Sequence, residues 1–383
     1  MRKVSQLLAC IFVFCLLPCP GRAADLKTGG KSTLLMDVST GTILHESNAH
    51  ESLAPASVTK VMTMLLIMEA IDSGKIDWED MVTTSEAAAA KGGSQVYLKV
   101  GESMSVTDML KSIAVSSAND CACAMAEHIA GSEAAFVELM NRRAKELGMN
   151  DTHFVNCTGL DDSEDAIRHR TSAHDIAVMS RQLLKNHPEI KKFTTIWMDS
   201  VRDGAFGLSN TNKLIRFYDG ATGLKTGFTS GAGYCLSASA LRDGMELIAV
   251  VMGAESSQIR FQSCKAMLDH GFANYSLIVP DLCDTGEVPV ILGKADFVQP
   301  KMEQTDAVLI DKAHRANVTT ETTLEASLPA PVLQGQRIGT MTIKSEDQIL
   351  KEIPLVAAEN VTRLSFGDIY ARVLRQAAMA KPA

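Results

Sequence analysis

One predicted helix constrains the fold more than any other feature, because it has almost no polar face. The stretch from Val58 to Ile71 has the length and composition of a helix, and it follows Pro55, which closes off the preceding segment. Its apolar residues leave little room for a solvated surface, so we expect it to be buried inside a larger fold. Ser57 lies where this helix is expected to begin.

Lys60 places a charge at the head of this apolar helix. Burying an ammonium group is costly, and a common outcome is a lowered pKa. A lysine that is neutral near physiological pH can act as a base, and three residues after Ser57 it lies on the same face as that hydroxyl. The alternative is a helix-capping serine with a lysine that extends to solvent. The S-x-x-K spacing alone leaves both interpretations open.

The chain of 383 residues is long enough for two or three domains. Its start combines basic MRK, apolar LLACIFVFCLLP and small-residue GRAA, a pattern typical of a secretory signal over residues 1–24. Without it the loss of Arg2, Lys3 and Arg22 leaves 34 basic and 45 acidic residues, a net charge of −11. This balance argues against nucleic acid as a partner.

Six cysteines remain after the signal, in no regular framework, and a chain this long does not need disulfides to fold. Cys121, Cys123 and His128 superficially suggest a metal site, but two thiols two residues apart on a helix point away from each other. No H-E-x-x-H or comparable zinc spacing occurs in the sequence. We therefore predict neither a metal nor another cofactor.

Helical and extended segments are arranged in a clear order. Two short strands are expected within residues 31–45, and helices over 106–130, 133–148, 172–187 and 258–272. LKTGF, YCLSASAL and ELIAVVMGA, within residues 224–254, are typical of three consecutive antiparallel strands. After about residue 278, short β-rich runs without a helical period predict a small all-β domain. The fold class is therefore α+β, an antiparallel sheet flanked by helices and followed by a β-rich domain.

Three short motifs bring nucleophilic chemistry into this framework. Ser57-Val58-Thr59-Lys60 is the only S-x-x-K of the chain, and Ser117-Ala118-Asn119 is the only S-x-N. A serine hydroxyl is a weak nucleophile that needs a positioned base, for which Lys60 is the candidate. Ser117 can relay a proton between the lysines and a leaving amine, and Asn119 can hold a substrate amide or orient Lys60.

The third motif, Lys225-Thr226-Gly227, lies on the first of the consecutive strands. Lys225 and Thr226 offer a cation and a hydroxyl suited to a carboxylate, and Gly227 lets a substrate backbone lie alongside the strand. The backbone N–H groups of Ser57 and Phe228 can form an oxyanion hole. A second K-T-G, which begins at Lys27, precedes the nucleophile and lies outside any predicted strand, so we assign it no role.

The ordered set S-x-x-K, S-x-N and K-T-G resembles the serine penicillin-recognising enzymes. The flanks PASVTKVMT, SSANDCACAMAEHIAG, NDTHFVNCTGLD and DGATGLKTGFTSGAGYCLSASA are similar to the low-molecular-mass penicillin-binding proteins that are D-alanyl-D-alanine carboxypeptidases. The resemblance runs from about residue 33 to the end. It implies a penicillin-recognising transpeptidase-like catalytic domain over residues 25–278 and a β-rich domain over 279–362.

The same resemblance implies an activity and a set of site residues. The activity is removal of the terminal D-alanine from peptidoglycan pentapeptide stems through an acyl-serine, which regulates cross-linking of the cell wall, with β-lactams as covalent inhibitors. Arg260 falls where the family carries an arginine that helps to bind the terminal carboxylate. The implied catalytic residues are Ser57, Lys60 and Ser117, and the implied substrate-binding residues are Asn119, Lys225, Thr226, Gly227, Phe228 and Arg260.

Three other functions are compatible with parts of the sequence. A class A β-lactamase needs a deacylating glutamate in an E-x-x-x-N stretch, which Glu146 to Asn150 matches as a string, although the family uses RAKELGMNDTHF as a helix end and turn. A non-catalytic wall-binding module would have no reason to keep all three motifs. A peptidoglycan DD-endopeptidase is closer chemistry, and the β-domain after the catalytic unit favours the carboxypeptidase over it.

The last segment, residues 363–383, has the pattern of an amphipathic helix. Its apolar positions form one stripe, and its net charge is +3 on an otherwise acidic chain. Such a helix is typical of a membrane interface that contains anionic lipid, and it is too short of apolar residues to span a bilayer. The alternative is a terminal helix packed on the β-domain. We expect an exported enzyme held peripherally on the outer face of the cytoplasmic membrane.

Overall fold

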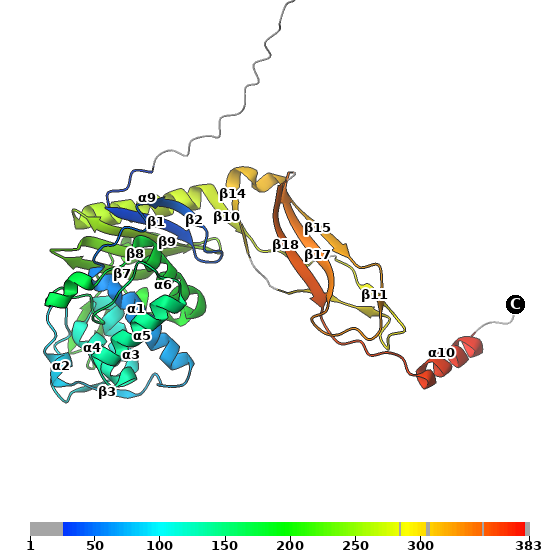
Figure 1. The fold of residues 1–383 in the computed structure, drawn as a ribbon, viewed down its shortest axis with the longest axis horizontal. Coiled ribbons are helices and arrows are strands. Elements are labelled where there is room, and N and C mark those ends of the chain that lie inside the picture. The colour runs from blue at the N-terminus through cyan, green and yellow to red at the C-terminus, as the bar shows by residue number, and fades with distance from the viewer. Residues whose placement is uncertain (1–25, 283–284, 304–306, 347, 380–383) are drawn as a thin grey trace, which may run out of the picture.

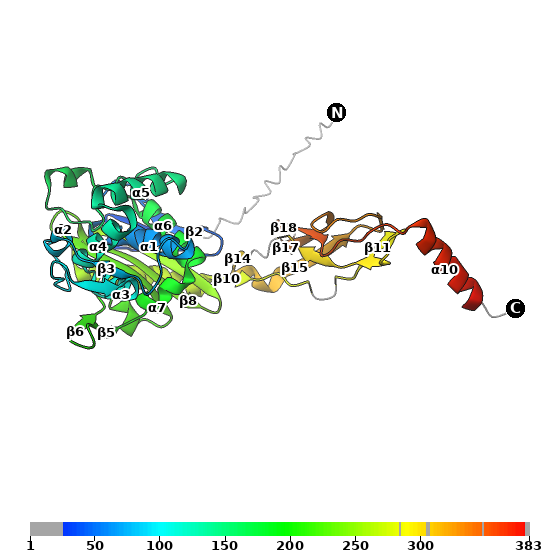
Figure 2. The same cartoon turned by 90° about the horizontal axis from the view of Figure 1, so that it is seen from below.

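The computed structural model describes residues 26–282, 285–303, 307–346 and 348–379. The predicted signal segment lies outside the described residues. Two units follow one another along the chain: an N-terminal unit of helices around a five-stranded sheet, and a C-terminal unit of strands that extends away from it (Figure 1, Figure 2). The predicted α+β organisation is confirmed.

The central sheet of the N-terminal unit is antiparallel, with strand order β2-β1-β9-β8-β7. Its strands are β1 (Ser32–Asp37), β2 (Ile43–Ser47), β7 (Ala221–Thr229), β8 (Gly233–Arg242) and β9 (Met245–Ala254). The last three are the consecutive strands predicted from the sequence. Asp243 and Gly244 connect β8 to β9 and both have positive φ, as a tight hairpin turn of this hand requires.

Helices cover both faces of this sheet (Figure 1), so β9 is apolar on both sides. Alternate residues of β9 belong to different cores, because side chains along a strand point to opposite faces. Ile248, Val250 and Met252 join the large core under the main helices, and Leu247, Ala249 and Val251 join the core under α9 (Ser257–Asn274).

The predicted helices are present. They are α1 (Lys60–Asp72), α3 (Val106–Ser116), α4 (Asn119–Ala130), α5 (Glu133–Glu146), α6 (Ala173–Asn186) and α9. Three short helices were not predicted: α2 (Glu86–Ala89), α7 (Lys191–Thr194) and α8 (Leu214–Phe217). Every residue of α1 from Lys60 to Met68 is buried, which confirms the predicted buried helix. The predicted helical stretch 106–130 is interrupted at Ser117, whose φ is 63°. Ser172 caps α6 by accepting a hydrogen bond from the N–H of Asp175.

The C-terminal unit consists of two small sheets, of order β12-β11-β16 and β13-β18-β17-β15, as predicted for an all-β segment. The strands are β11 (Val288–Ile291), β12 (Phe297–Val298), β13 (Pro300–Met302), β15 (Val318–Leu324), β16 (Leu328–Pro329), β17 (Arg337–Ser345) and β18 (Gln348–Ala357). Outside these sheets, β10 (Tyr275–Ile278) pairs with β14 (Val308–Asp311) between the two units. Two further antiparallel pairs, β3 (Met81–Thr83) with β4 (Ser103–Ser105) and β5 (Met198–Val201) with β6 (Phe206–Ser209), lie on the N-terminal unit.

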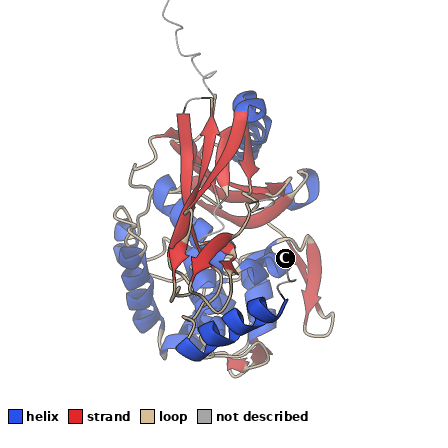
Figure 3. Ribbon diagram, turned by 90° about the vertical axis from the view of Figure 1, so that its right-hand side faces the viewer, coloured by secondary structure: helices blue, strands red, loops and turns tan. Residues whose placement is uncertain are grey.

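The last described element is α10 (Phe366–Met379), a helix beyond the strands of the C-terminal unit (Figure 1) and the helix that leads to the C-terminus in Figure 3. Its polar face contacts the turn after β11: Arg372 pairs with Asp296 at 2.8 Å, and Asp368 lies 3.7 Å from Lys294. The apolar stripe is exposed, at Phe366, Ile369, Tyr370, Val373 and Leu374. The predicted helix is confirmed, and its apolar side chains do not pack on the strands. Within the described residues, no helix is both long and apolar enough to cross a membrane.

Candidate active site

Ser57 lies in the short 3₁₀ turn Ala56–Thr59 that leads into α1. The turn starts from an unusual backbone, because Ala56 has φ 47°. The Thr59 hydroxyl donates to the Ala56 carbonyl at 2.8 Å and lies 2.8 Å from His169 Nε2. Since His169 Nδ1 accepts from the N–H of Val155, Nε2 carries the proton and donates to Thr59. This chain of hydrogen bonds fixes the residue before the nucleophile.

Lys60 reaches the Ser57 hydroxyl from the first position of α1. Its Nζ lies 3.1 Å from Ser57 Oγ and 2.8 Å from the carbonyl oxygen of Thr158. The side chain is completely buried. Burial lowers the pKa of Lys60 from 10.5 to about 7, against smaller opposing effects of Cys157 and Asp120. The alternative of a lysine extending to solvent is wrong, and the predicted proximity to Ser57 is confirmed.

The Thr158 carbonyl belongs to a loop, residues 156–159, that is shaped by Asn156. The Asn156 Oδ1 accepts hydrogen bonds from Thr158 N, Thr158 Oγ1 and Gly159 N, at 3.1, 3.2 and 2.7 Å. Gly159 has φ 82°, and a Cβ there would lie 1.8 Å from the Ala56 carbonyl oxygen. Glycine is therefore required for the loop to lie against the nucleophile turn.

Ser117 and Asn119 flank the break between α3 and α4. The left-handed backbone of Ser117 ends α3, and its hydroxyl is buried. The loop of residues 92–94 holds Asn119, because the Gly92 carbonyl accepts from Asn119 Nδ2 and the Ser94 carbonyl from Asn119 N, both at 2.7 Å.

Three atoms of the predicted site residues are buried without a protein hydrogen-bond partner among the described residues. They are Ser117 Oγ, Asn119 Oδ1 and Arg260 Nε. Buried polar atoms are normally paired, so unpaired ones gathered at one site indicate groups arranged for a ligand.

The K-T-G segment lies on β7, the edge strand of the central sheet, directly against the nucleophile turn. A Cβ on Gly227 would lie 2.7 Å from the Pro55 carbonyl oxygen and 3.0 Å from the backbone nitrogen of Ser57. The absence of a side chain at Gly227 lets β7 approach Ser57 this closely. Thr226 donates its hydroxyl proton to Thr211 Oγ1 at 2.6 Å.

Two basic side chains, Lys225 and Arg260, lie behind Gly227. Lys225 is 1 % exposed and donates to the carbonyl of Thr226 at 2.9 Å. Burial lowers its pKa well below the ordinary range, and the charges of Lys60 and Arg260 lower it further. Arg260, on α9, donates to the carbonyl oxygens of Gly227 and Cys235 at 2.9 and 3.1 Å. A bound carboxylate would favour the charged form of Lys225, which suits the predicted role of these residues.

Phe228 follows the K-T-G segment and is 52 % exposed. The centroid of its ring lies 4.3 Å from that of Tyr234. The structure brings its strand and Ser57 together, while the oxyanion hole of their two backbone N–H groups stays a prediction.

Sequence reasoning missed Asn156, Thr158, Thr211 and His169. The stretch NCTGL resembles the family, but no sequence signal indicated that the carbonyl of Thr158 would contact Lys60. His169 has no motif around it. Burial lowers the pKa of His169 to about 4, and the neighbouring basic side chains of His153, Arg170 and Lys60 add to the effect.

Comparison with known proteins decides the family. The model of the family Peptidase S11, D-alanyl-D-alanine carboxypeptidase, matches residues 21–256. The chain belongs to this family. It is 43% identical to the D-alanyl-D-alanine carboxypeptidase DacF of Bacillus subtilis over 90% of this chain and 89% of the relative. The D-alanyl-D-alanine carboxypeptidase DacC of Escherichia coli is 34% identical over 90% of this chain and 86% of its own length.

Solved structures extend the family likeness to both units. The crystal structure of penicillin-binding protein 5 from Haemophilus influenzae matches with a TM-score of 0.75 and 30% identity, over 89% of this chain and 100% of that one. Penicillin-binding protein D2 from Listeria monocytogenes, in its ampicillin-bound form, matches with a TM-score of 0.59 and 31% identity, over 65% of this chain and 100% of that one. Residues 281–363 match the C-terminal domain of penicillin-binding protein 5. This member of the carboxypeptidase family therefore has both of its expected domains.

The position of Glu146 also separates this family member from a class A β-lactamase. Glu146 is the last residue of α5, is half-exposed, and pairs with Arg143 at 3.0 Å. The E-x-x-x-N string thus belongs to a helix end and its turn, as expected. Within the described residues, no group of three or more histidine, cysteine or acidic side chains is arranged to hold a metal ion.

Proposed function

We propose that Ser57 is the nucleophile and Lys60 its general base in the removal of the terminal D-alanine from peptidoglycan stem peptides. The observation that carries this assignment is the buried Lys60 Nζ, 3.1 Å from Ser57 Oγ, with a pKa of about 7. Such a lysine is neutral in a substantial fraction of the enzyme molecules at physiological pH, and it lies within reach of the proton that it must take. The family membership supports a serine carboxypeptidase.

The reaction has two steps. Ser57 Oγ attacks the carbonyl carbon between the last two D-alanines while its proton passes to Lys60, and the C–N bond then breaks as the leaving amine takes a proton through Ser117. Water next attacks the acyl-serine, which frees the shortened peptide and restores the Ser57 hydroxyl. The backbone N–H groups of Ser57 and Phe228 stabilise the oxyanion in both steps.

The remaining site residues bind the substrate. The Arg260 guanidinium and the hydroxyl of Thr226 attract the carboxylate of the terminal D-alanine, Lys225 takes its charged form as that carboxylate binds, and Asn119 holds a peptide amide. Gly227 leaves the edge of β7 free of a side chain, so an extended peptide can add alongside the strand. The burial and pKa of Lys225 support this role, because a carboxylate compensates a desolvated cation.

Two measurements test the assignment on one preparation. Incubation with a D-alanyl-D-alanine pentapeptide should release free D-alanine without cross-linked dimers, and peptide mapping after labelling with a fluorescent penicillin should place the adduct on Ser57. The matched variant Ser57→Ala should show neither reaction. An adduct on Ser117 would refute the assignment of the nucleophile. If the pentapeptide releases no D-alanine while a cross-linked dimer, supplied as a second substrate, is cleaved, the result would favour the endopeptidase.

We further propose that the protein is exported and is held on the outer face of the cytoplasmic membrane by α10. The exposed apolar stripe of this helix and the basic residues of the last segment support an interfacial position. A variant that ends after Val361 should leave anionic vesicles while its hydrolysis of a soluble pentapeptide stays intact. Equal flotation of the full-length and shortened proteins with these vesicles would contradict the anchor. The mature exported chain should begin near residue 25.

A further inference from the structure

Two loops hold polar groups of the active site through backbone carbonyls. Asn119 is bound by two carbonyls of loop 92–94, each at 2.7 Å. Lys60 Nζ is bound by a carbonyl of loop 156–159 at 2.8 Å. Neither loop is part of a helix or strand, so its position depends on side-chain contacts. A group that fixes both loops would fix the base and the S-x-N motif at once.

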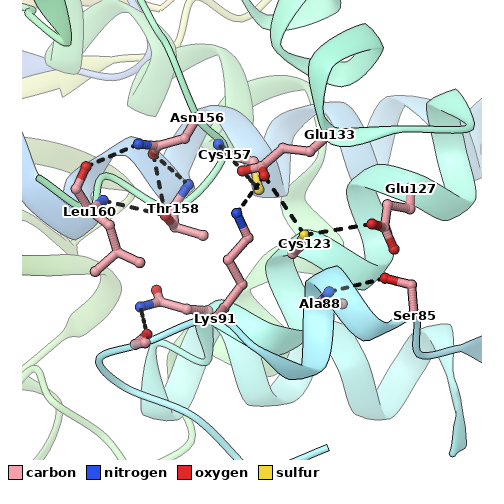
Figure 4. Close-up of polar contacts among 12 residues, drawn as sticks. Ser85, Ala88, Lys91, Cys123, Glu127, Glu133, Asn156, Cys157, Thr158 and Leu160 are labelled. Atoms are coloured by element: carbon pink, nitrogen blue, oxygen red, sulfur yellow. Dashed lines mark hydrogen bonds and ion pairs between the residues drawn. The ribbon is translucent and has the colours of Figure 1, made fainter. Parts of the chain in front are cut away.

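Glu133, the first residue of α5, contacts Cys157 in loop 156–159 and Lys91, which directly precedes loop 92–94 (Figure 4). Its Oε2 accepts a hydrogen bond from Nζ of Lys91, the residue before loop 92–94, at 2.5 Å. Its Oε1 accepts from both the N–H and the thiol of Cys157, the second residue of the other loop, each at 3.2 Å. The thiol of Cys123 also approaches the carboxylate, at 3.9 Å. One carboxylate therefore joins two segments that are far apart in sequence.

The Lys91–Glu133 pair is largely removed from solvent, with side chains that are 24% and 21% exposed. Burial acts to raise the pKa of Glu133, but the hydrogen bond and charge of Lys91 outweigh it and hold that pKa below its ordinary value. The same contacts raise the pKa of Lys91 against the effect of its own burial. Both groups are therefore charged at neutral pH, and removing one leaves the other as a partly buried, unpaired charge.

We propose that Glu133 and Lys91 are positioning residues for acylation, which hold loop 92–94 and loop 156–159 in register around Ser57. This inference rests on the proposed function of Ser57 and Lys60. Lys91 acts on Asn119 through the adjoining loop, while Glu133 acts on Asn119 through Lys91 and on Lys60 through Cys157. Neither side chain is assigned a contact with the reacting atoms. A displacement of about 1 Å in such a site can cost about 100-fold in rate.

A second ion pair on the same helix provides the control. Arg143 of α5 lies 2.8 Å from Glu69 of α1, with side chains 23% and 26% exposed. It matches the Lys91–Glu133 pair in burial and connects α5 to α1. Among the described residues, its hydrogen bonds are to other groups than the two loops. Breaking it should cost similar stability without moving the site.

The test compares the full-length variants Lys91→Met, Glu133→Gln, Glu133→Ala and Glu69→Gln. The second-order rate constant of acylation by a fluorescent penicillin is measured from pH 5 to 9, together with kcat and KM on a pentapeptide and the melting temperature. Glutamine keeps an acceptor for the Cys157 N–H but loses the charge that holds Lys91, whereas alanine loses both. Lys91→Arg tests rescue by a residue that keeps the charge.

Lys91→Met and Glu133→Gln should each lower the second-order rate constant of acylation about tenfold, and should act on the pentapeptide mainly by raising KM. The pH at which the acylation rate falls on the acid side should stay unchanged. Glu133→Ala should lower the acylation rate constant about 100-fold. It should also shift the pH at which the rate falls on the acid side, because the Thr158 carbonyl no longer holds Lys60 in place. Glu69→Gln should have a lower melting temperature than the parent but an acylation rate constant within twofold of it. Lys91→Arg should recover most of the acylation rate that Lys91→Met loses.

Equal losses in Glu69→Gln, or rates within twofold of the parent in Lys91→Met and Glu133→Ala, would overturn the positioning role. If Glu133→Ala does not fold, Lys91→Met and its arginine rescue decide alone. A parent protein that is not acylated on Ser57 would instead refute the proposed function.

Discussion

Replacing Lys60 by methionine removes the amine but keeps a long, flexible side chain in a completely buried site. The folded pKa of Lys60 is about 7 and the ordinary value is 10.5. Between these two values the unfolded chain binds more protons than the folded one, so the contribution of this group makes stability rise with pH. Each pH unit inside the window is worth about 1.4 kcal/mol. Between pH 7, where the folded group is half-titrated, and pH 9, the gain is about 2 kcal/mol.

The Lys60→Met variant should lack this gain. Urea unfolding gives the free energy of unfolding of the parent and of the variant at pH 7 and at pH 9. The difference between the two proteins should be about 2 kcal/mol larger at pH 9 than at pH 7. The matched control is Lys75→Met, at an exposed lysine just beyond α1, which should follow the parent at both values. A stability difference between parent and Lys60→Met that stays constant from pH 7 to 9 would show that Lys60 keeps its ordinary pKa when folded.

The acylation rate should report the same pKa. Below about pH 7 Lys60 is protonated and cannot accept the Ser57 proton, so the parent rate should fall about tenfold per pH unit, and it should level off above pH 7. Lys60→Met should have an acylation rate about 100- to 10,000-fold lower than the parent, the range that general-base catalysis supplies. A folded variant acylated at the parent rate would refute the assignment of the base.

Three further substitutions test neighbouring groups. Lys225→Ala should raise KM for a peptide with a free terminal carboxylate at least tenfold, and should affect a peptide with an amidated terminus much less, as steady-state kinetics on both peptides can show. Gly227→Ala should cost about 1–3 kcal/mol in urea unfolding and lower acylation, because its Cβ would lie 2.7 Å from the Pro55 carbonyl oxygen. Thr59→Val should cost about 1–3 kcal/mol, since it leaves the Ala56 carbonyl and the His169 N–H without their partner; unchanged stability would contradict that account.

Periodicity predicted most of the fold because burial patterns are local. Along β7 to β9 the side chains point alternately to different cores, or turn residues mark the strand ends. Helix α1 is apolar all round. Each of these elements was therefore predictable from its own residues. The pairing of β10 with β14 was not predictable in this way. These strands are about 30 residues apart, and nothing in either segment specifies the other as its partner.

The site was predictable where a motif carries its own geometry. S-x-x-K places two side chains one turn apart, whereas the contacts of Lys60 with Thr158 and of Glu133 with Cys157 join segments that only the tertiary fold brings together. Loop carbonyls carry no sequence signature, because every residue has one. Glycine was the exception, since at Gly227 and Gly159 the missing side chain marks a close approach of two backbones.

The local geometry of the nucleophile explains why its base lies three residues away. The sequence predicted that Ser57 begins an α-helix, in which residues three apart share a face but are offset around the axis. The structure instead has a 3₁₀ turn from Ala56 to Thr59, followed at once by α1. With three residues per turn, side chains at positions i and i+3 lie in line. Lys60 therefore lies directly over Ser57. Because its side chain is completely buried, its charged form is disfavoured and its pKa is low. The position that aims the amine at the hydroxyl is thus also the one that lets the amine accept the proton.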